Sequence, residues 1–205
     1  MASIGELLAR SKAIAGDRAG KGQTSPEAVS ADAGGEIGAE CGWLARQLRT
    51  SGKRLIGLLP ASSQTDVLGL AATVGGALTM IIHDVVIIAD PDQRSVTGEL
   101  PSGAAVACSF VSARLITIVP VERPREGARI TAVKTLLELV GQTSDVAAVL
   151  LDLSSFVLPG ELLGVIGMVE GIVIVGRAGR VTDAELLSAS RRVPAEMNLG
   201  VVLTD

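Results

Sequence analysis

Short apolar runs alternate with segments of helical periodicity over most of the chain. Most of the runs are continuous rather than alternating, which is typical of strands buried on both faces of a sheet. The predicted strands are Leu55–Leu59, Val85–Ala89, Leu115–Val119, Val146–Leu151, Ile172–Val175 and Leu199–Leu203. The predicted helices are Ile37–Thr50, Thr65–Met80, Ile130–Val140, Gly160–Val169 and Thr182–Arg192. This alternation predicts right-handed βαβ units, and therefore an α/β fold with a mostly parallel central sheet flanked by helices.

Two of the predicted helices carry more specific signals. In the first helix, Trp43, Leu44 and Leu48 are predicted to lie on one side. The last helix has Thr182 as its expected N-cap, and Glu185 is placed for a capping box, in which each residue satisfies a backbone amide of the other.

The chain is long enough for one sizeable domain with an N-terminal extension. Of its 205 residues 48% are apolar and only 1% aromatic, so Val, Ile, Leu and Ala must fill the core. Residues 1–38 are predicted to form a flexible extension with a short helix at Ser3–Ala15, because Gly, Ala, Ser and charged residues dominate Gly16–Gly38. Residues 39–205 are predicted to form the α/β domain.

Charge, cysteine content and hydropathy narrow the functional classes and the compartment. A formal net charge of −4 without a local run of Lys or Arg disfavours binding to nucleic acid. No segment approaches the ~18 uninterrupted apolar residues of a membrane span, so a cytoplasmic protein is predicted. Cys41 and Cys108 are interpreted as buried thiols of a reducing compartment, and the lone histidine, His83, as a structural residue at the wrong end of its strand.

The segment Pro60–Asp66, between the first strand and its helix, is the first candidate site. Ligands of such sheets bind beyond the carboxyl ends of the strands. Ser62, Ser63 and Thr65 are candidates for weak anion binding there, or for simple helix capping, which is the usual role of Ser and Thr at this position. A phosphate cradle needs Gly and Lys, but Leu58–Leu68 contains neither. The sequence therefore predicts at most a vestigial nucleotide site.

Carboxylates follow two further strands. Asp90 and Asp92 come directly after one apolar run together with Arg94, and Asp152 ends another. This arrangement suits a magnesium ion or its water next to a nucleotide, or else local pairing and turn capping with no ligand. Because the phosphate cradle is missing, we predict no bound metal, no catalytic residue and no cofactor, with magnesium–ATP as the alternative.

The order of these motifs resembles the cytoplasmic kinase domain of bacterial tyrosine kinases that regulate capsular and exopolysaccharide chain length, relatives of the MinD and ParA ATPases. Arg46–Thr50 resembles the second half of the E-x-x-R-x-x-R helix of that family. Val85–Arg94 resembles the hydrophobic strand followed by D-x-D-x-R, and Leu115–Pro120 the next strand. Ala147–Asp152 resembles the Walker B strand, and Gly171–Asp205 the closing strand, helix and strand. The resemblance implies a P-loop NTPase-like fold from about Trp43 to the end of the chain.

The departures from the family pattern bear most on function. Ser63 stands about where the family has its Walker A lysine, and Thr65 about where it has its threonine. The chain has no tyrosine, so the tyrosine autophosphorylation of the family is impossible within it. Trp43 replaces the glutamate of the oligomerising helix, so it is a candidate anchor for a different partner, with a place in the core as the alternative.

The leading expectation is a pseudokinase: a catalytically inactive accessory protein of exopolysaccharide or capsule biosynthesis, chain-length regulation or export. The resemblance implies a partner in the cytoplasmic part of a membrane polysaccharide co-polymerase or export protein, which would hold the chain at the inner membrane, and it leaves a homo-oligomer open. An atypical ATPase or kinase that uses Asp90, Asp92 and Asp152 is the alternative. A MinD-like positioning protein is a further one.

Overall fold

The computed structural model describes residues 37–82, 84–89, 106–112, 114–120, 128–143, 146–156 and 159–204. The predicted extension, residues 1–38, lies outside the described residues except for its last two, which belong to a helix. His83, Asp90 and Asp92 also lie outside them. None of the described helices is long and apolar enough to cross a bilayer.

A single sheet of seven strands forms the centre of the described structure, in the order β3-β4-β2-β5-β1-β6-β7. The strands are β1 (Leu55–Pro60), β2 (Asp84–Ile88), β3 (Val106–Ser112), β4 (Leu115–Pro120), β5 (Val146–Asp152), β6 (Gly171–Arg177) and β7 (Asn198–Thr204). All neighbouring pairs are parallel except β3 and β4, which are antiparallel. The prediction of a mostly parallel sheet is confirmed, whereas strand β3 was not predicted.

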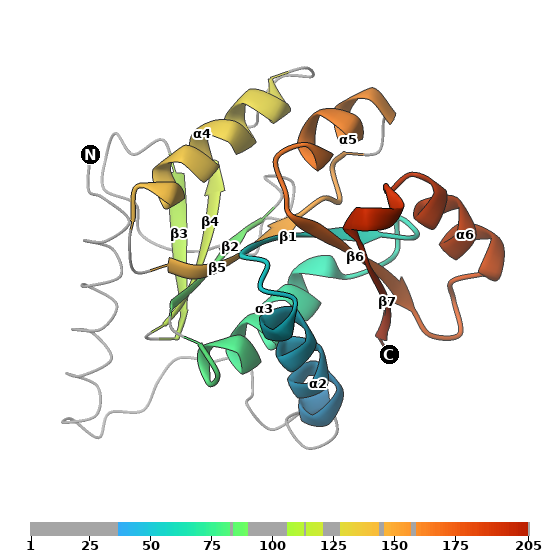
Figure 1. Cartoon of the computed structure of the whole chain (residues 1–205), viewed down its shortest axis with the longest axis horizontal. Coiled ribbons are helices and arrows are strands. Elements are labelled where there is room, and N and C mark those ends of the chain that lie inside the picture. The colour runs from blue at the N-terminus through green and yellow to red at the C-terminus, as the bar shows by residue number, and fades with distance from the viewer. Residues whose placement is uncertain are drawn as a thin grey trace.

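Helices cover both faces of this sheet (Figure 1). They are α2 (Ile37–Thr50), α3 (Val67–Thr79), α4 (Arg129–Gly141), α5 (Pro159–Ile166) and α6 (Asp183–Arg191), with a short 3-10 helix, η2 (Ala195–Met197). Helices α2 and α3 lie on one face, and α4, α5 and α6 lie on the other. The fold therefore has three layers, and the loops that follow the parallel strands meet at one edge.

Strand β2 shows why the apolar runs are continuous. All five of its residues and the following Ala89 are buried. Val86 and Ile88 belong to the core on the side of α4 and α5, whereas Val85 and Ile87 belong to the core on the side of α2 and α3. Successive side chains of a strand point to opposite faces, so a strand covered on both sides needs apolar residues at nearly every position, and Asp84, at the start of β2, is its one polar residue.

In helix α2, Trp43 does not lie on the same side as Leu44 and Leu48, contrary to the prediction. Its buried residues are Cys41, Leu44, Ala45 and Leu48, which follow the i, i+3, i+4, i+7 spacing of one helix face. Trp43 lies on the opposite face and is 56% exposed. The helix therefore packs on α3 through its small and aliphatic residues, and the alternative in which Trp43 is a core residue is wrong.

The capping box of α6 is confirmed. The Thr182 hydroxyl accepts from the Glu185 amide at 3.3 Å, and a Glu185 carboxylate oxygen accepts from the Thr182 amide at 2.8 Å. The bond from this amide, followed by that from the Thr182 hydroxyl, lowers the pKa of Glu185. These bonds fix the start of the helix, and thereby the path from β6 to β7.

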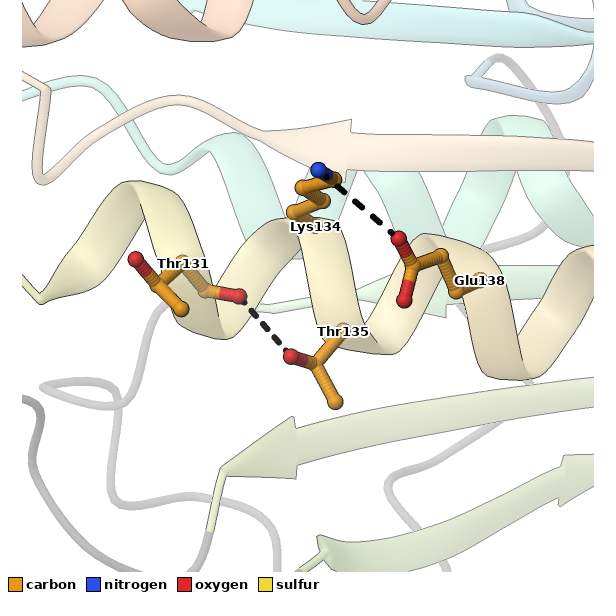
Figure 2. Close-up of polar contacts among 4 residues, drawn as sticks. All are labelled: Thr131, Lys134, Thr135 and Glu138. Carbon is orange, nitrogen blue, oxygen red and sulfur yellow. Dashed lines mark hydrogen bonds and ion pairs between the residues drawn. The ribbon is translucent and has the colours of Figure 1, made fainter.

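Polar side chains of helix α4 contact one another on the surface of the helix (Figure 2). Thr135 donates its hydroxyl to the carbonyl of Thr131 at 3.0 Å, and Lys134 lies 4.0 Å from Glu138. Both charged side chains are largely exposed, so this ion pair contributes only about 0.3 to 0.5 kcal/mol. Packing of the opposite, apolar face must therefore supply most of the stability of the helix.

Candidate functional site

The loops after β1 and β5 lie side by side because these two strands are neighbours. Leu58 is paired with Asp152 in their parallel register, and the amide of Leu153 donates to the carbonyl of Leu58 at 3.0 Å. The segment 61–66 after β1 therefore faces the residues that follow Asp152. Two regions that the sequence singled out separately meet at the carboxyl edge of the sheet, where ligands of such folds bind.

The segment 61–66 forms a turn, and the amides of Ala61, Thr65 and the following Val67 bond to the protein itself. Ala61 donates its amide to the carbonyl of Val175 at 2.7 Å, and Thr65 donates to the carbonyl of Ser62 at 3.3 Å. The amide of Val67 donates to the carbonyl of Thr65 at 3.1 Å. The hydroxyls of Ser62 and Thr65 are also 3.3 Å apart. A phosphate cradle presents such amides to its ligand, so this turn is a different structure.

The N-terminus of α3 is capped by a carboxylate. Asp66 is the N-cap, and its Oδ1 accepts from the amide of Gly69 at 2.9 Å. A Cβ atom at Gly69 would lie 2.4 Å from the other carboxylate oxygen, so the glycine allows the close approach. The helix dipole favours a negative charge at this end, and Asp66 provides it from within the chain. A phosphate placed there would be repelled by this carboxylate.

Asp152 is 2% exposed at the end of β5. Its Oδ1 accepts from the amide of Ser154 at 2.9 Å and from the Ser154 hydroxyl at 2.5 Å. Both bonds fold the chain back directly after the strand, in the manner of an Asx turn. The buried carboxylate therefore has a structural role in forming this turn.

A cavity of about 250 Å³ opens between the two loops. The described residues of its lining are apolar or carry hydroxyls, apart from one arginine: Leu59, Pro60, Ala61, Ser62, Ser63, Thr65, Leu153, Ser154, Phe156 and Arg192. Pockets that enclose drug-sized ligands measure roughly 300 to 1,000 Å³. This cavity is therefore suited to a group smaller than a nucleotide.

Arg192 directly follows α6 and was not identified from the sequence. Its Nη2 donates to the carbonyl of Phe156 at 3.3 Å, which holds the guanidinium against the loop after β5. The sequence indicates this position of Arg192 only weakly. Arginines at the end of a helix usually bond to its last carbonyls or interact with the helix dipole. Only the packing of α6 on the sheet shows that this side chain reaches the cavity.

The residues around this cavity do not fit a nucleoside triphosphate. The amides of Ala61 and Thr65 are bonded to protein carbonyls, Asp66 caps the N-terminus of α3, and the cavity is small. Among the described residues, no three His, Cys, Asp or Glu side chains gather as a metal site. Asp90 and Asp92, the other predicted metal-side carboxylates, lie outside the described residues.

The structure thus brings four of the six predicted site residues to one edge. Ser62, Ser63 and Thr65 line the cavity, and Asp152 is connected to it through Ser154, which also lines it. Thr65 is predicted as the first residue of the helix and instead precedes the N-cap. Arg192 is the functional group that sequence reasoning missed.

Three solved structures resemble the described fold. The kinase domain of Escherichia coli tyrosine kinase ETK matches with a TM-score of 0.64 and 15% identity, over 92% of this chain and 85% of that one. The chimerical protein CapA2B2 matches with a TM-score of 0.63 and 12% identity, over 82% and 84%. The BceF tyrosine kinase domain matches with a TM-score of 0.60 and 18% identity, over 82% and 75%.

The sequence itself matches no model of a protein family and no curated protein. At these identities the structural matches establish the fold, and a fold supports several functions. The chain has the α/β fold of these tyrosine kinase domains.

Proposed function

We propose that this protein is a catalytically inactive, kinase-like accessory protein of exopolysaccharide or capsule biosynthesis, chain-length regulation or export. It acts in the cytoplasm by binding the cytoplasmic part of a membrane co-polymerase or export protein. The link to polysaccharide rests on the sequence resemblance described above, together with the kinase fold.

The proposed lack of catalytic activity rests on the structure of the loop after β1. In a nucleotide-binding member of this fold, the amides of this loop and the N-terminus of α3 hold the phosphates. Here the amides of Ala61 and Thr65 bond to protein carbonyls, and Asp66 caps the helix. No lysine lies between Lys53 and Lys134 to complete a phosphate site. Without these contacts, phosphoryl transfer loses the positioning and charge stabilisation on which it depends.

The exposed face of α2 supports the binding part of the proposal. Trp43 is 56% exposed, and Arg46, Gln47 and Thr50 are exposed near it at helical spacing. Trp and Arg are the residue types that contribute most often to binding hot spots. We propose this α2 face as the contact for the membrane partner.

One observation favours the alternative, an atypical ATPase. Asp152 is buried at the carboxyl end of β5, beside a cavity that contains a guanidinium. A carboxylate at this place positions a magnesium-bound water in active relatives of the fold. Calorimetric titration of the wild type and Asp152→Ala with magnesium–ATP and magnesium–ADP separates the two functions.

Trp43 supplies its own test of partner binding, because it is the only tryptophan and the chain has no tyrosine. Titrating the purified chain with the cytoplasmic segment of a polysaccharide co-polymerase is expected to shift the Trp43 emission to shorter wavelength and to saturate. Trp43→Ala should weaken this binding by about 2 kcal/mol, or roughly thirtyfold, measured by calorimetry.

Leu187→Ala is the matched control, since Leu187 is 52% exposed but lies on α6, on the opposite face of the sheet. Its affinity should equal that of the wild type. The proposed contact is wrong if Leu187→Ala weakens binding as much as Trp43→Ala, or if co-polymerase segments leave the emission unchanged.

A further inference from the structure

Strand β7 forms one end of the sheet and, among the described residues, pairs only with β6. Its seven residues, Asn198–Thr204, include no charged residue and no proline. Proteins usually protect such an edge with lysine, proline or a bulge, because its outward N–H and C=O groups can pair with another strand. The register shift between β6 and β7 lies at Ile172 and Val173, opposite the start of β7, so residues 201–204 continue as a regular strand.

The outward backbone groups of this edge belong to Val201 and Leu203. In a parallel pair, every second residue directs both its N–H and its C=O towards the neighbouring strand, and the residues between direct both away. Thr204 is of the first kind, because it is paired with β6 and its carbonyl accepts from the amide of Ala178 at 2.6 Å. Val202 therefore also faces β6, and the N–H and C=O groups of Val201 and Leu203 point away from it.

The side chains of Val201 and Leu203 are exposed as well. Together with Leu187 of α6, they make up half of the six large exposed hydrophobic side chains among the described residues. A Cβ atom at Gly176 would lie near both Leu203 and Leu186 of α6, so Leu203 lies on the α6 side of the sheet, and Val201, two residues away, lies on the same side. Single apolar side chains on a surface are ordinary, but here they accompany a strand edge that pairs with no described strand.

We propose that β7 pairs with β7 of a second copy of this chain, antiparallel and about a two-fold axis, so that the two sheets become one. Val201 of one copy then lies opposite Leu203 of the other, and the two Val202 residues face each other at the axis. Each pair of Val201 and Leu203 exchanges hydrogen bonds between the outward backbone groups and brings two apolar side chains together. The inference goes beyond the proposed function and does not depend on it.

The charges of α6 favour a second copy over an unrelated strand. This helix begins with Asp183 and ends with Arg191, and both are exposed. Because it connects the parallel strands β6 and β7, it runs opposite to β7, beside that strand (Figure 1). A two-fold axis at β7 makes the α6 helices of the two copies antiparallel, with the acidic start of each on the same side as the basic end of the other. The edge is therefore complementary to itself in backbone groups, apolar side chains and charge.

Sedimentation equilibrium of the full chain, from micromolar to millimolar concentration, tests the proposal. Wild-type protein should associate into dimers. Val201→Lys should raise the dissociation constant of the dimer at least about tenfold, because it sets a charge against Leu203 of the second copy in both pairs. Leu163→Lys, which adds the same charge at an exposed leucine of α5, should leave the constant within about twofold of the wild type, and so should Trp43→Ala on the α2 face.

Hydrogen exchange of the wild type, followed by NMR, identifies the contact even if Val201→Lys fails to fold. The amides of Val201 and Leu203 should exchange more slowly at concentrations where the dimer forms, because each then donates to a carbonyl of the second copy. The amide of Ser63, in the turn after β1, should keep its rate.

The proposal is overturned if the wild type stays monomeric at millimolar concentration, if Val201→Lys and Leu163→Lys dimerise equally well, or if the dimer forms without slower exchange at Val201 and Leu203. A dimer that Trp43→Ala disrupts also overturns it, and assigns self-association to the α2 face. None of these results bears on the loss of the nucleotide site, which magnesium–ATP binding tests separately.

Discussion

Leu150→Ala is expected to lower the free energy of unfolding by about 2 to 5 kcal/mol. Leu150 is fully buried in β5, the central strand of the sheet, and is paired in register with Ile56 of β1 and Ile87 of β2. Its truncation removes apolar contacts and leaves a cavity that the two neighbouring strands cannot close. Urea unfolding followed by circular dichroism measures the change as a lower midpoint at an unchanged slope.

Leu163→Ala is the control for this substitution. Leu163 is 64% exposed on α5, so the same change of side chain should alter stability by less than about 0.5 kcal/mol. Equal losses in the two variants would contradict the placement of β5 at the centre of the sheet.

Gly75→Leu should destabilise the protein by about 1 to 3 kcal/mol, whereas Gly76→Leu should stabilise it by about 0.5 to 1 kcal/mol. Gly75 is buried where α3 packs on the sheet, and even a Cβ atom there would lie 2.8 Å from Leu115 Cδ1 and 3.6 Å from Ile87 Cδ1. A Cβ atom at Gly76 would have nothing within 4 Å, so leucine there gains only its helix propensity.

The opposite signs at adjacent positions make this pair a sensitive test of how α3 is rotated on the sheet. Thermal unfolding of the two variants should move the midpoint in opposite directions. If both variants lose stability equally, α3 does not pack with Gly75 against β2 and β4.

The fold was predictable from the sequence because its central strands are covered on both faces. Strand β2 is apolar at nearly every position, and this continuity distinguishes a buried parallel strand from a half-exposed one. Strand β3 was missed, since Val106–Ser112 mixes Ala, Cys and Ser with larger residues. It pairs only with β4, at one end of the described sheet, and an edge strand needs a weaker apolar pattern than a central one.

Trp43 shows a second limit of hydropathy. Its size and aromatic character favour burial. Its position along the helix determines its exposure, however, because Cys41, Leu44 and Leu48 form the buried face and Trp43 lies on the opposite one. A stricter count of helical spacing would have placed Trp43 outside.

The candidate site was predictable only in part. Ser62, Ser63, Thr65 and Asp152 were identified because the carboxyl ends of parallel strands share one edge. The sequence could not show that β1 and β5 are neighbours, nor that Asp66 caps α3. Arg192 was invisible because its approach to the cavity depends on how α6 packs, which no local pattern encodes.

Calorimetric titration of the purified chain with magnesium–ATP and magnesium–ADP tests the central claim, the loss of the nucleotide site, most directly. We expect no saturable binding in the micromolar range and the same result for Asp152→Ala, since the amides of Ala61 and Thr65 are bonded to protein carbonyls and the turn after β1 contains no lysine. Micromolar binding that requires magnesium and disappears in Asp152→Ala would contradict it, and would favour the atypical ATPase, whose turnover would then be measured.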